Sequence, residues 1–502
     1  MEYSTQVARY GMQEIRLTGE SGGNPYIERE VFGEFTGAHE SKRVRGFYDG
    51  EGVYKVRFMP AFEGEYSFRI TGNYVDGAEE HTGRFDVVPP RSGEHGPVHA
   101  VGTRLYYADG TAHVDIGTTC YVWTWQTDAM VERTLESLRR GPFNKIRFCI
   151  FPKHYDYNYR DPVSFPYEGT PCDNSGIDKF TFSDYNPDTP GNSWDFSRFN
   201  PAHFRRFERC VERLRDMGIQ ADVILMHPYD RWGFSRMPAW ADDLYLRYAV
   251  ARLAAYSNVW WSLANEFDFM RYKTAADWER FGRLVTAEDP YRHMLGVHNC
   301  FTMFDHSRPW VTHCSVQRIE GFHELTSIPD YLEIYKKPVV IDEMCYEGNV
   351  RYGWGNISGR ELTRRSWTAL TKGAWPGHSE TYIQPGENLW WSHGGELHGE
   401  SVARLGFMRK FIEQHVPGCA LKSCGLYAIP ADGRVDDGSW RLYYFGAARP
   451  SDQVYRFKPG EAYRATLIDT WGMTYKDLGT LQGNCELALP GDEDMALLLE
   501  RL

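Results

Sequence analysis

Between residues 103 and 415, short apolar segments alternate with longer segments that have helical periodicity. Alternation of strands with helices of about 12 to 20 residues is typical of repeated βα units, which build parallel sheets. Eight βα units within roughly 310 residues predict a closed TIM (β/α)₈ barrel with some long loops. The expected strands are residues 113–118, 145–151, 220–226, 259–263, 294–298, 311–316, 338–341 and 373–375.

The expected helices carry recognisable start and stop signals. Asn200 and Pro201 are suited to the N-cap and the first position of a helix, and Gly141 is suited to end one. Ser358 and Glu361 have the spacing of a capping box. These signals agree with the helix positions that the periodicity predicts.

An open, doubly wound sheet is the alternative to a barrel. No Gly-x-Gly-x-x-Gly motif follows the first expected strand, so a dinucleotide crevice has no support. The longest insertion, residues 152–194, follows the second strand and is rich in Tyr, Asp, Pro and Gly. Because the loops after barrel strands build substrate pockets, we expect this insertion beside the active site; a disordered insert is the alternative.

The segments on either side of the expected barrel have a strand pattern. Apolar and polar residues alternate at 53–59 and 66–70, and the alternation returns at 439–445 and 463–469. We therefore expect a multidomain α/β protein, a central barrel flanked by an N-terminal and a C-terminal β-sandwich. The expected domains are residues 1–90, 91–415 and 416–502.

The charge balance argues against a nucleic-acid partner. The chain carries 56 Lys and Arg against 68 Asp and Glu, a net charge of −12, and no basic block stands out. Aromatic residues make up 15% of the sequence, with 16 Trp and 32 Tyr. Such rings stack on sugars, although a large aromatic core is the alternative explanation.

Several features bear on location and cofactors. Residues 1–14 lack the basic and apolar regions of a signal peptide, and no window approaches the roughly 18 apolar residues of a membrane span. The ten cysteines show no CxxC spacing, which favours a reduced protein without disulfides or structural zinc. We expect a cytoplasmic protein without metal, other cofactors or membrane contacts, which could form a homo-oligomer.

Two glutamates end expected barrel strands. Glu266 ends the fourth strand and Glu343 ends the seventh. Catalytic residues of barrels lie at the carboxyl ends of strands, and strands four and seven face each other across the barrel mouth. Hydrolysis of a glycosidic bond with retention requires two carboxyl groups about 5–5.5 Å apart. The pair predicts this chemistry, whereas either glutamate alone could be a helix-cap neighbour or a solvated rim residue.

These strand ends resemble clan A of the glycoside hydrolases, whose barrels carry glutamates on strands four and seven, and most closely the apiosidase-like bacterial barrels. Such barrels often have an N-terminal sandwich and a C-terminal β domain. The resemblance covers nearly the whole chain. The segments that carry it are Val259-Trp-Trp-Ser-Leu-Ala-Asn-Glu-Phe-Asp268 and Pro338-Val-Val-Ile-Asp-Glu343.

The resemblance implies a role for each matching position. Glu266 would be the general acid/base and Glu343 the nucleophile. Asn265 would hydrogen-bond the hydroxyl next to the anomeric carbon. Arg147, on the second strand, would keep Glu343 ionised, although a structural salt bridge is the alternative.

One position departs from the pattern of the clan. Its members commonly place on strand six a Tyr that touches the nucleophile, and this strand has none. Gln317 or His313 could replace it. Further candidates for sugar contacts, each with core packing or an indirect role as the alternative, are His227, His298, Trp375, Trp123, Trp125, His378, Glu380, Trp390 and Trp391.

We therefore expect a retaining glycoside hydrolase that acts on a carbohydrate substrate. Resemblance to the apiosidase-like barrels implies exo-cleavage of plant-derived oligosaccharides or glycosides. The alternatives are a carbohydrate-binding protein on an inactive barrel, an inverting hydrolase and a metal-dependent barrel hydrolase. The last would usually open with His-x-His on strand one, which reads Asp115-Ile-Gly-Thr118 here.

Overall fold

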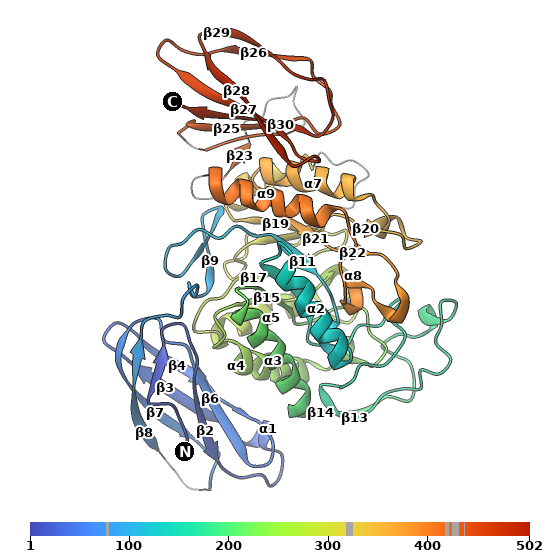
Figure 1. Ribbon diagram of the computed structural model, residues 1–502. Coiled ribbons are helices and arrows are strands. Elements are labelled where there is room, and N and C mark those ends of the chain that lie inside the picture. The colour runs from blue at the N-terminus through green and yellow to red at the C-terminus, as the bar shows by residue number, and fades with distance from the viewer. Residues whose placement is uncertain (77–79, 318–324, 417–420, 424–430, 436) are drawn as a thin grey trace.

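A nearly closed barrel of eight parallel strands forms the centre of the computed structural model (Figure 1). The structure describes residues 1–76, 80–317, 325–416, 421–423, 431–435 and 437–502. In order around the barrel, the strands are β17 (Leu295–Gly296), β16 (Val259–Ser262), β15 (Gln220–Ile224), β12 (Lys145–Cys149), β11 (Gly117–Thr119), β21 (Trp375–His378), β19 (Val339–Glu343) and β18 (Cys314–Gln317).

All eight expected strands are present, but three start two or more residues later along the chain than expected. One of them, β18, starts at Cys314 instead of residue 311. β11 starts four residues later than expected, because His113 and Asp115 precede the strand and bind each other in the barrel core. β21 starts two residues later, because Gly373 has a φ of +95° and forms the turn after α7 (Gly359–Thr371). The displacement of β21 changes which residues reach the carboxyl end of the barrel.

The strands β17 and β18 meet without a regular ladder. Thr312, which precedes β18, donates its backbone N–H to the carbonyl of Leu295 at 2.9 Å. Beyond it, the ring of His298 lies 3.2 Å from the Ser315 hydroxyl and 3.2 Å from the Gln317 side chain. We call this junction the seam, because side chains close the barrel there.

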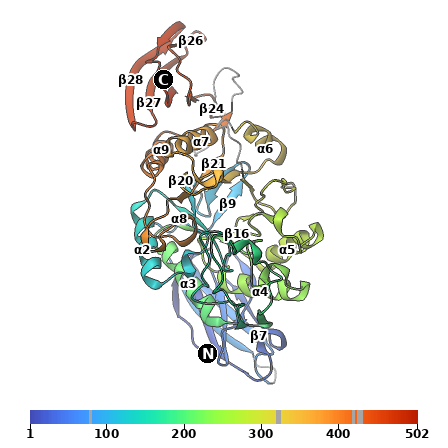
Figure 2. The ribbon, with the colours of Figure 1, turned by 90° about the vertical axis from the view of Figure 1, so that its right-hand side faces the viewer.

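Helices surround the barrel, as the sequence predicted for most connections (Figure 2). The connection from β17 to β18, residues 297–313, is described throughout and contains no helix, so one expected βα unit lacks its helix. In the described chain, the N-terminal part contains α1 (Pro25–Glu28). The helices that follow it are α2 (Asp128–Arg140), α3 (Pro201–Asp216), α4 (Ala239–Leu253), α5 (Ala275–Glu288), α6 (Ile328–Tyr335), α7, α8 (Trp390–His393) and α9 (Ser401–His415).

The predicted helix signals are confirmed with one difference. The Asn200 side chain caps α3 ahead of Pro201, and Gly141 ends α2. Ser358 caps α7 by accepting the Glu361 N–H, but the Glu361 carboxylate binds Arg365 at 2.9 Å. The Ser358 half of the expected capping box is present, whereas an arginine one turn later binds the carboxylate that would form the other half.

The insertion at 152–194 is built into the barrel mouth. It contributes β13 (Tyr167–Thr170), a short 3₁₀ turn, Phe182–Asp184, and the start of β14 (Ser193–Phe199), which pairs with β13. Its Asp161 pairs at 2.5 Å with Arg231, a buried residue in the loop after β15. The insertion therefore lies on the expected side of the barrel.

Two sheets precede the barrel, at the end of the molecule that carries the N-terminus (Figure 1). They pack together through Phe35 and Phe58, whose rings stack at 4.3 Å. Their strands are β1 (Gln6–Ala8), β8 (His81–Val88), β7 (Gly64–Gly72), β3 (Val31–Thr36) and β4 (Ser41–Arg45) in one sheet, and β2 (Gln13–Thr18), β6 (Val53–Phe58) and β5 (Phe47–Tyr48) in the other. A hairpin, β9 (Val98–Val101) and β10 (Arg104–Tyr107), leads into the barrel.

A six-stranded sheet and a strand pair follow the barrel at the opposite end of the molecule (Figures 1 and 2). The expected start of this part, residue 416, borders residues 417–420, which lie outside the described chain. The sheet consists of β23 (Lys422–Ser423), β24 (Ala431–Arg434), β25 (Trp440–Tyr444), β30 (Met495–Arg501), β27 (Ala462–Asp469) and β28 (Thr474–Gln482), and the pair of β26 (Asp452–Arg456) and β29 (Asn484–Ala488).

A cluster of charges joins the C-terminal sheet to α7 of the barrel. The carboxylate of Asp494, at the start of β30, binds Arg360 and Arg364 at 2.5 Å each. Asp494 is 2% exposed and has a φ of +60°. The cluster therefore combines a buried carboxylate with a backbone conformation that Asp and Asn tolerate best.

Replacing Asp494 by Asn should lower the free energy of unfolding by about 1–3 kcal/mol, because the Arg360 guanidinium loses its anion and that of Arg364 keeps only Glu493. Asn retains the shape and the left-handed backbone, so the loss reports the charge. Chemical denaturation of the variant measures the effect, with the neighbouring, exposed Asp492→Asn as control. Equal stability of both variants would contradict a role of the cluster in docking the sheet.

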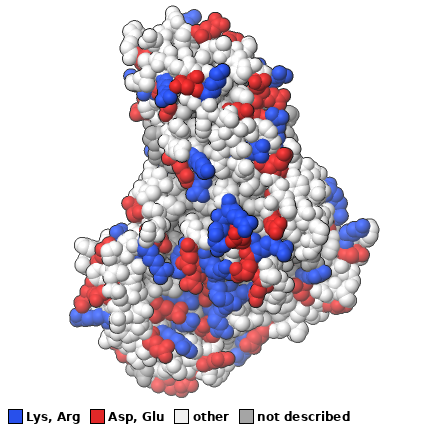
Figure 3. All heavy atoms as spheres, viewed as in Figure 1, with Lys and Arg blue, Asp and Glu red and all other residues white. Residues whose placement is uncertain are grey.

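Surface charge is mixed on the face shown in Figure 3. Basic and acidic side chains interleave over α2 and α3, where Arg206 pairs with Asp128 and Arg213 with Glu132. This face therefore offers no continuous basic surface to a nucleic acid. Among the helices of the described chain, none combines the length and the apolar character needed to cross a bilayer.

Candidate active site

Glu266 and Glu343 line one pocket at the carboxyl ends of the barrel strands, with a cavity volume of about 210 Å³. Both are buried, with exposed fractions of 5% and 8%. Glu266 follows β16 in a left-handed conformation with φ of +49°, which is uncommon outside glycine and is found at functional sites. The pocket is lined by Tyr121, Lys153, Tyr155, Tyr229, Glu266, Phe269, Cys300, Phe301, Gln317, Glu343, Cys345, Tyr346, Trp354 and Trp391.

Gln317, at the end of β18, lies between the two glutamates. The Gln317 amide can be oriented so that both its oxygen and its nitrogen have suitable hydrogen-bond partners. In that orientation, the nitrogen is 3.1 Å from Glu266 Oε1 and 3.3 Å from Glu343 Oε2. One small group therefore spans the gap between the carboxylates. His313, the other residue considered for this position, lies outside the lining, with its ring 5.4 Å from that of Trp260.

The carboxylate of Glu343 is surrounded by hydrogen-bond donors and positive charge. The Tyr121 hydroxyl donates to Oε1, and Arg147 Nη1 lies 3.4 Å from the same oxygen. His298 Nε2 is 3.5 Å away. Burial opposes ionisation, but the His298 contact, the Arg147 charge and the Tyr121 hydrogen bond outweigh it and hold the pKa of Glu343 below its usual value.

The carboxyl group of Glu266 has the opposite electrostatic environment. Burial and the nearby Glu343 charge raise its pKa, and the Lys153 charge and the Tyr229 hydrogen bond oppose them only in part. Tyr229 donates its hydroxyl to Oε2, and Asn265 Nδ2 is 3.4 Å from the same oxygen. Two neighbouring carboxyl groups with pKa values pushed apart can act as an acid and a nucleophile.

Arg147 and Asn265 are held together beside the glutamates. Arg147 Nη1 donates to Asn265 Oδ1 at 2.7 Å, and Nη2 donates to the Ser262 hydroxyl at 3.3 Å. The Asn265 amide nitrogen faces the Glu266 carboxyl group. The expected positions of both residues next to the carboxylates therefore agree with the geometry.

The other expected sugar contacts fall into two groups. His298 reaches Glu343, and Trp391 lines the pocket. His227 contacts the Phe151 carbonyl at 3.4 Å and is absent from the pocket lining. Its ring supports the loop after β12, so the expectation of a direct sugar contact does not fit its position.

Three tryptophans that the sequence predicted as sugar contacts are packed inside the protein. Trp125 stacks on His203 at 3.7 Å, and Trp123 packs on Phe148 at 5.5 Å. Trp375 starts β21, so it lies at the amino end of the barrel, opposite the glutamates. None of the three lines the glutamate pocket, and a platform role does not fit these positions.

Three further candidates are also outside the pocket. His378 stacks at 4.6 Å on Phe143, in the loop between α2 and β12. Trp390 donates its ring N–H to the Thr118 hydroxyl at 2.9 Å. Glu380 accepts the backbone N–H of Gly399 at 2.7 Å ahead of α9, so it supports a helix start.

Sequence reasoning missed the rings that form most of the pocket wall. Tyr121 follows β11, Tyr155 follows β12 and Tyr229 follows β15. Tyr121 occupies the place next to the nucleophile candidate that the sequence assigned to strand six. A survey extended a few residues past each strand end would have found these tyrosines, because those residues form the barrel mouth.

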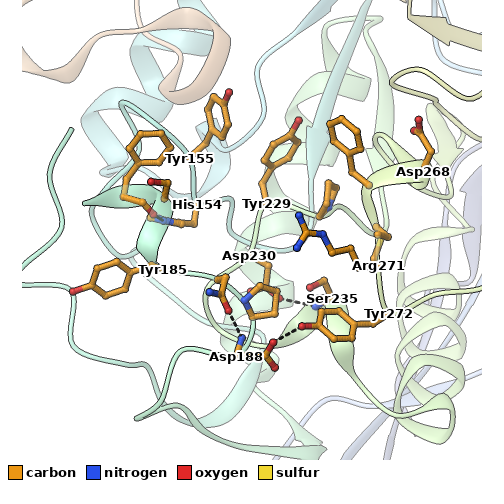
Figure 4. Close-up of a pocket in the computed structure, with 17 residues that line it drawn as sticks. His154, Tyr155, Tyr185, Asp188, Tyr229, Asp230, Ser235, Asp268, Arg271 and Tyr272 are labelled. Carbon is orange, nitrogen blue, oxygen red and sulfur yellow. Dashed lines mark hydrogen bonds between the residues drawn. The ribbon is translucent and has the colours of Figure 1, made fainter. Parts of the chain in front are cut away.

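A larger cavity of about 630 Å³ adjoins the glutamate pocket (Figure 4). The two spaces share Tyr155, Tyr229 and Phe269 as a common wall. The insertion supplies Tyr185 and Asp188, and Tyr272, after β16, donates its hydroxyl to Asp188. The cavity therefore extends from the side of the pocket where Tyr229 touches Glu266.

Replacing Tyr121 by Phe should lower kcat/KM by about 10- to 100-fold, because the Glu343 carboxylate loses a donor. The same loss raises the pKa of Glu343, so the acidic limb of the pH profile should move to higher pH. Tyr382→Phe is the matched control, since Tyr382 donates at 3.1 Å to a buried carboxylate outside the pocket, Glu347. An unchanged acidic limb in Tyr121→Phe would contradict this role.

Comparison with known protein families identifies the family of this barrel. A family model described as the apiosidase-like catalytic domain matches residues 102–414. The chain belongs to the apiosidase-like family. Two further models, domains of unknown function DUF5060 and DUF5605, match residues 6–73 and 429–500 of this apiosidase-like protein.

Solved structures agree with the family. A candidate glycoside hydrolase from Bacteroides vulgatus ATCC 8482 is 31% identical, with a TM-score of 0.90 over 99% of this chain and 100% of the other. A glycoside hydrolase family 5 protein from the same organism is 13% identical, with a TM-score of 0.59 over 81% of this chain and 92% of the other, and shares the fold. No curated protein matches. This apiosidase-like protein is a glycosidase.

Proposed function

We propose that the protein is a retaining glycosidase in which Glu343 is the nucleophile and Glu266 the general acid/base. The observation that carries the proposal is the Gln317 amide nitrogen within 3.1 and 3.3 Å of the two carboxylates. The nearest carboxylate oxygens are therefore no farther apart than the sum of these distances. That limit is compatible with the roughly 5–5.5 Å between the carboxyl groups of retaining enzymes, in which the second carboxylate attacks the sugar directly.

Each step of double displacement has a group suited to it. The ionised Glu343 attacks the anomeric carbon while Glu266 gives its proton to the leaving oxygen. A glycosyl-enzyme ester forms, and Glu266, now a carboxylate, takes a proton from the water that cleaves it. Asn265 lies where it can bind the hydroxyl next to the anomeric carbon, held there by Arg147.

Exo-cleavage fits the sizes of the two spaces. The glutamate pocket, about 210 Å³, is smaller than the roughly 300–1,000 Å³ of sites for larger ligands, which suits one sugar ring. The adjoining cavity of about 630 Å³ begins at the Glu266 side, where the leaving group departs. We infer a terminal sugar in the pocket and an oligosaccharide or aglycone in the cavity.

The proposed substrates are plant-derived oligosaccharides or glycosides, as the family resemblance suggests. We propose the domains 1–90, 91–415 and 416–502, which accommodate the matches to the three family models. Among the described residues, no three His, Cys, Asp or Glu side chains gather as metal ligands. We also propose that the barrel belongs to clan A of the glycoside hydrolases.

Hydrolysis of a panel of p-nitrophenyl glycosides, pentofuranosides included, tests the proposal. NMR of the first product should show the anomeric configuration of the substrate. A product of opposite configuration would support the inverting alternative. Absence of turnover on the panel, with sugar binding intact, would instead favour a carbohydrate-binding protein.

A further inference from the structure

Lys153 follows β12 and carries its ammonium into the glutamate pocket, inside a cage of aromatic rings. Nζ is 3.3 Å from the centroid of the Tyr121 ring and 4.2 Å from that of Tyr229. The rings of Trp391 and Tyr155 lie at 4.8 and 5.9 Å. The residue is 3% exposed. The cation is thus nearly removed from water while it forms part of the pocket wall.

Equally buried lysines elsewhere in the barrel have carboxylate partners. Lys145, with 2% of its side chain exposed, binds Asp115 at 2.7 Å. Lys273, with 3% exposed, binds Asp242 at 2.5 Å. Among the residues that the structure describes, no carboxylate lies within ion-pairing distance of Lys153. A buried ammonium in a substrate pocket is thus left without the anion that such groups normally have.

The other charges of the pocket do not fill this role. Arg147 already faces the ionised Glu343, at 3.4 Å, and Glu266 is uncharged when it acts as an acid. Burial lowers the pKa of Lys153 to about 8, so the ammonium remains the main form at neutral pH. In the free pocket, Glu343 therefore balances the charge of Arg147, whereas the charge of Lys153 has no balancing anion among the described residues.

We propose that Lys153 binds a carboxylate of the substrate, so that the sugar in the glutamate pocket is a uronic acid or a related sugar acid. The proposal rests on the proposed function, since it assumes that the terminal sugar occupies this pocket. A carboxylate gains a strong attraction to an ammonium held in a dry cage. A neutral sugar offers only hydroxyls and leaves the charge without an anion.

An anionic sugar would also suit the acid role of Glu266. The Lys153 charge favours the ionised form of Glu266 and so opposes its function as an acid. A carboxylate bound to Lys153 would cancel much of this effect. The sugar that fits the cage would thereby keep Glu266 protonated for the first step.

Paired substrates test the specificity. We would compare p-nitrophenyl glucuronides and galacturonides, in both anomeric forms, with the corresponding glucosides and galactosides. The natural protein should prefer an acidic sugar by about 100-fold in kcat/KM. Lys153→Met and Lys153→Gln should lose most of this preference, mainly through KM. Lys179→Met removes an exposed lysine of the same insertion and should keep it.

Calorimetric binding of free D-glucuronate, D-galacturonate, D-glucose and D-galactose to the same four proteins gives a second readout. Binding of the acids that requires Lys153 supports the proposal even without hydrolysis, in which case only the proposed glycosidase mechanism fails. Equal turnover and binding of acidic and neutral sugars by the natural protein would overturn it. So would an unchanged preference in whichever Lys153 variant retains the natural melting temperature.

Discussion

Replacing Glu343 by Ala should lower kcat/KM for any hydrolysed glycoside by at least about 10⁴-fold, because the attacking group is removed. The neighbours that hold Glu343 ionised, Tyr121 and Arg147, would then face an empty space. A small anion can occupy that space. Added azide should therefore restore turnover and yield a glycosyl azide of configuration opposite to the substrate.

The control for this experiment is Glu396→Ala, an exposed glutamate in the loop before α9, which should have nearly natural activity. Kinetics with and without azide, and NMR of the azide product, are the measurements. Residual activity within tenfold of the natural protein would rule out Glu343 as nucleophile. Loss of activity without azide rescue, but with a glycosyl azide of inverted configuration formed in a Glu266 variant, would point to exchanged roles.

Replacing Glu266 by Ala should produce a loss that depends on the leaving group, because only a poor leaving group needs the proton. Hydrolysis of alkyl glycosides should fall by about 10²–10⁴-fold, whereas dinitrophenyl glycosides should still form the glycosyl-enzyme quickly. The second step lacks its base, so the glycosyl-enzyme should accumulate and give a burst of dinitrophenol.

Azide distinguishes this variant from the first. It should intercept the glycosyl-enzyme and yield a glycosyl azide of the same configuration as the substrate. Pre-steady-state kinetics with a series of aryl leaving groups measure the burst and its dependence on leaving-group pKa. An equal loss across the series would contradict the acid role.

Much of the fold could be predicted because its signals are local. The strand and helix periods near the barrel depend on neighbouring residues, and so do the caps at Asn200 and Ser358. The glutamate pair was also predictable, since a strand count places Glu266 and Glu343 on opposite sides of the mouth. Each of these inferences needs only the order of elements and the geometry of a closed barrel.

The rest of the pocket depends on contacts between distant segments. Tyr121 approaches Glu343 from the loop after β11, more than two hundred residues away. Trp375 was expected at the mouth, and a two-residue shift of β21 past the turn at Gly373 moved it to the other end. The cage around Lys153 draws rings from four segments. The spacing of residues along the sequence does not indicate contacts between such distant segments.

At the seam between β17 and β18, closure of the barrel and the shape of the pocket depend on the same side chains. His298 and Ser315 help to close the barrel there, and the same histidine touches Glu343 and Gln317. Other neighbouring strands are joined by backbone ladders, which tolerate changes of side chain. Beyond the backbone hydrogen bond from Thr312 to Leu295, β17 and β18 are joined by side chains that also shape the pocket. A substitution of His298 or Ser315 that reshapes the pocket would therefore also change how firmly the barrel closes.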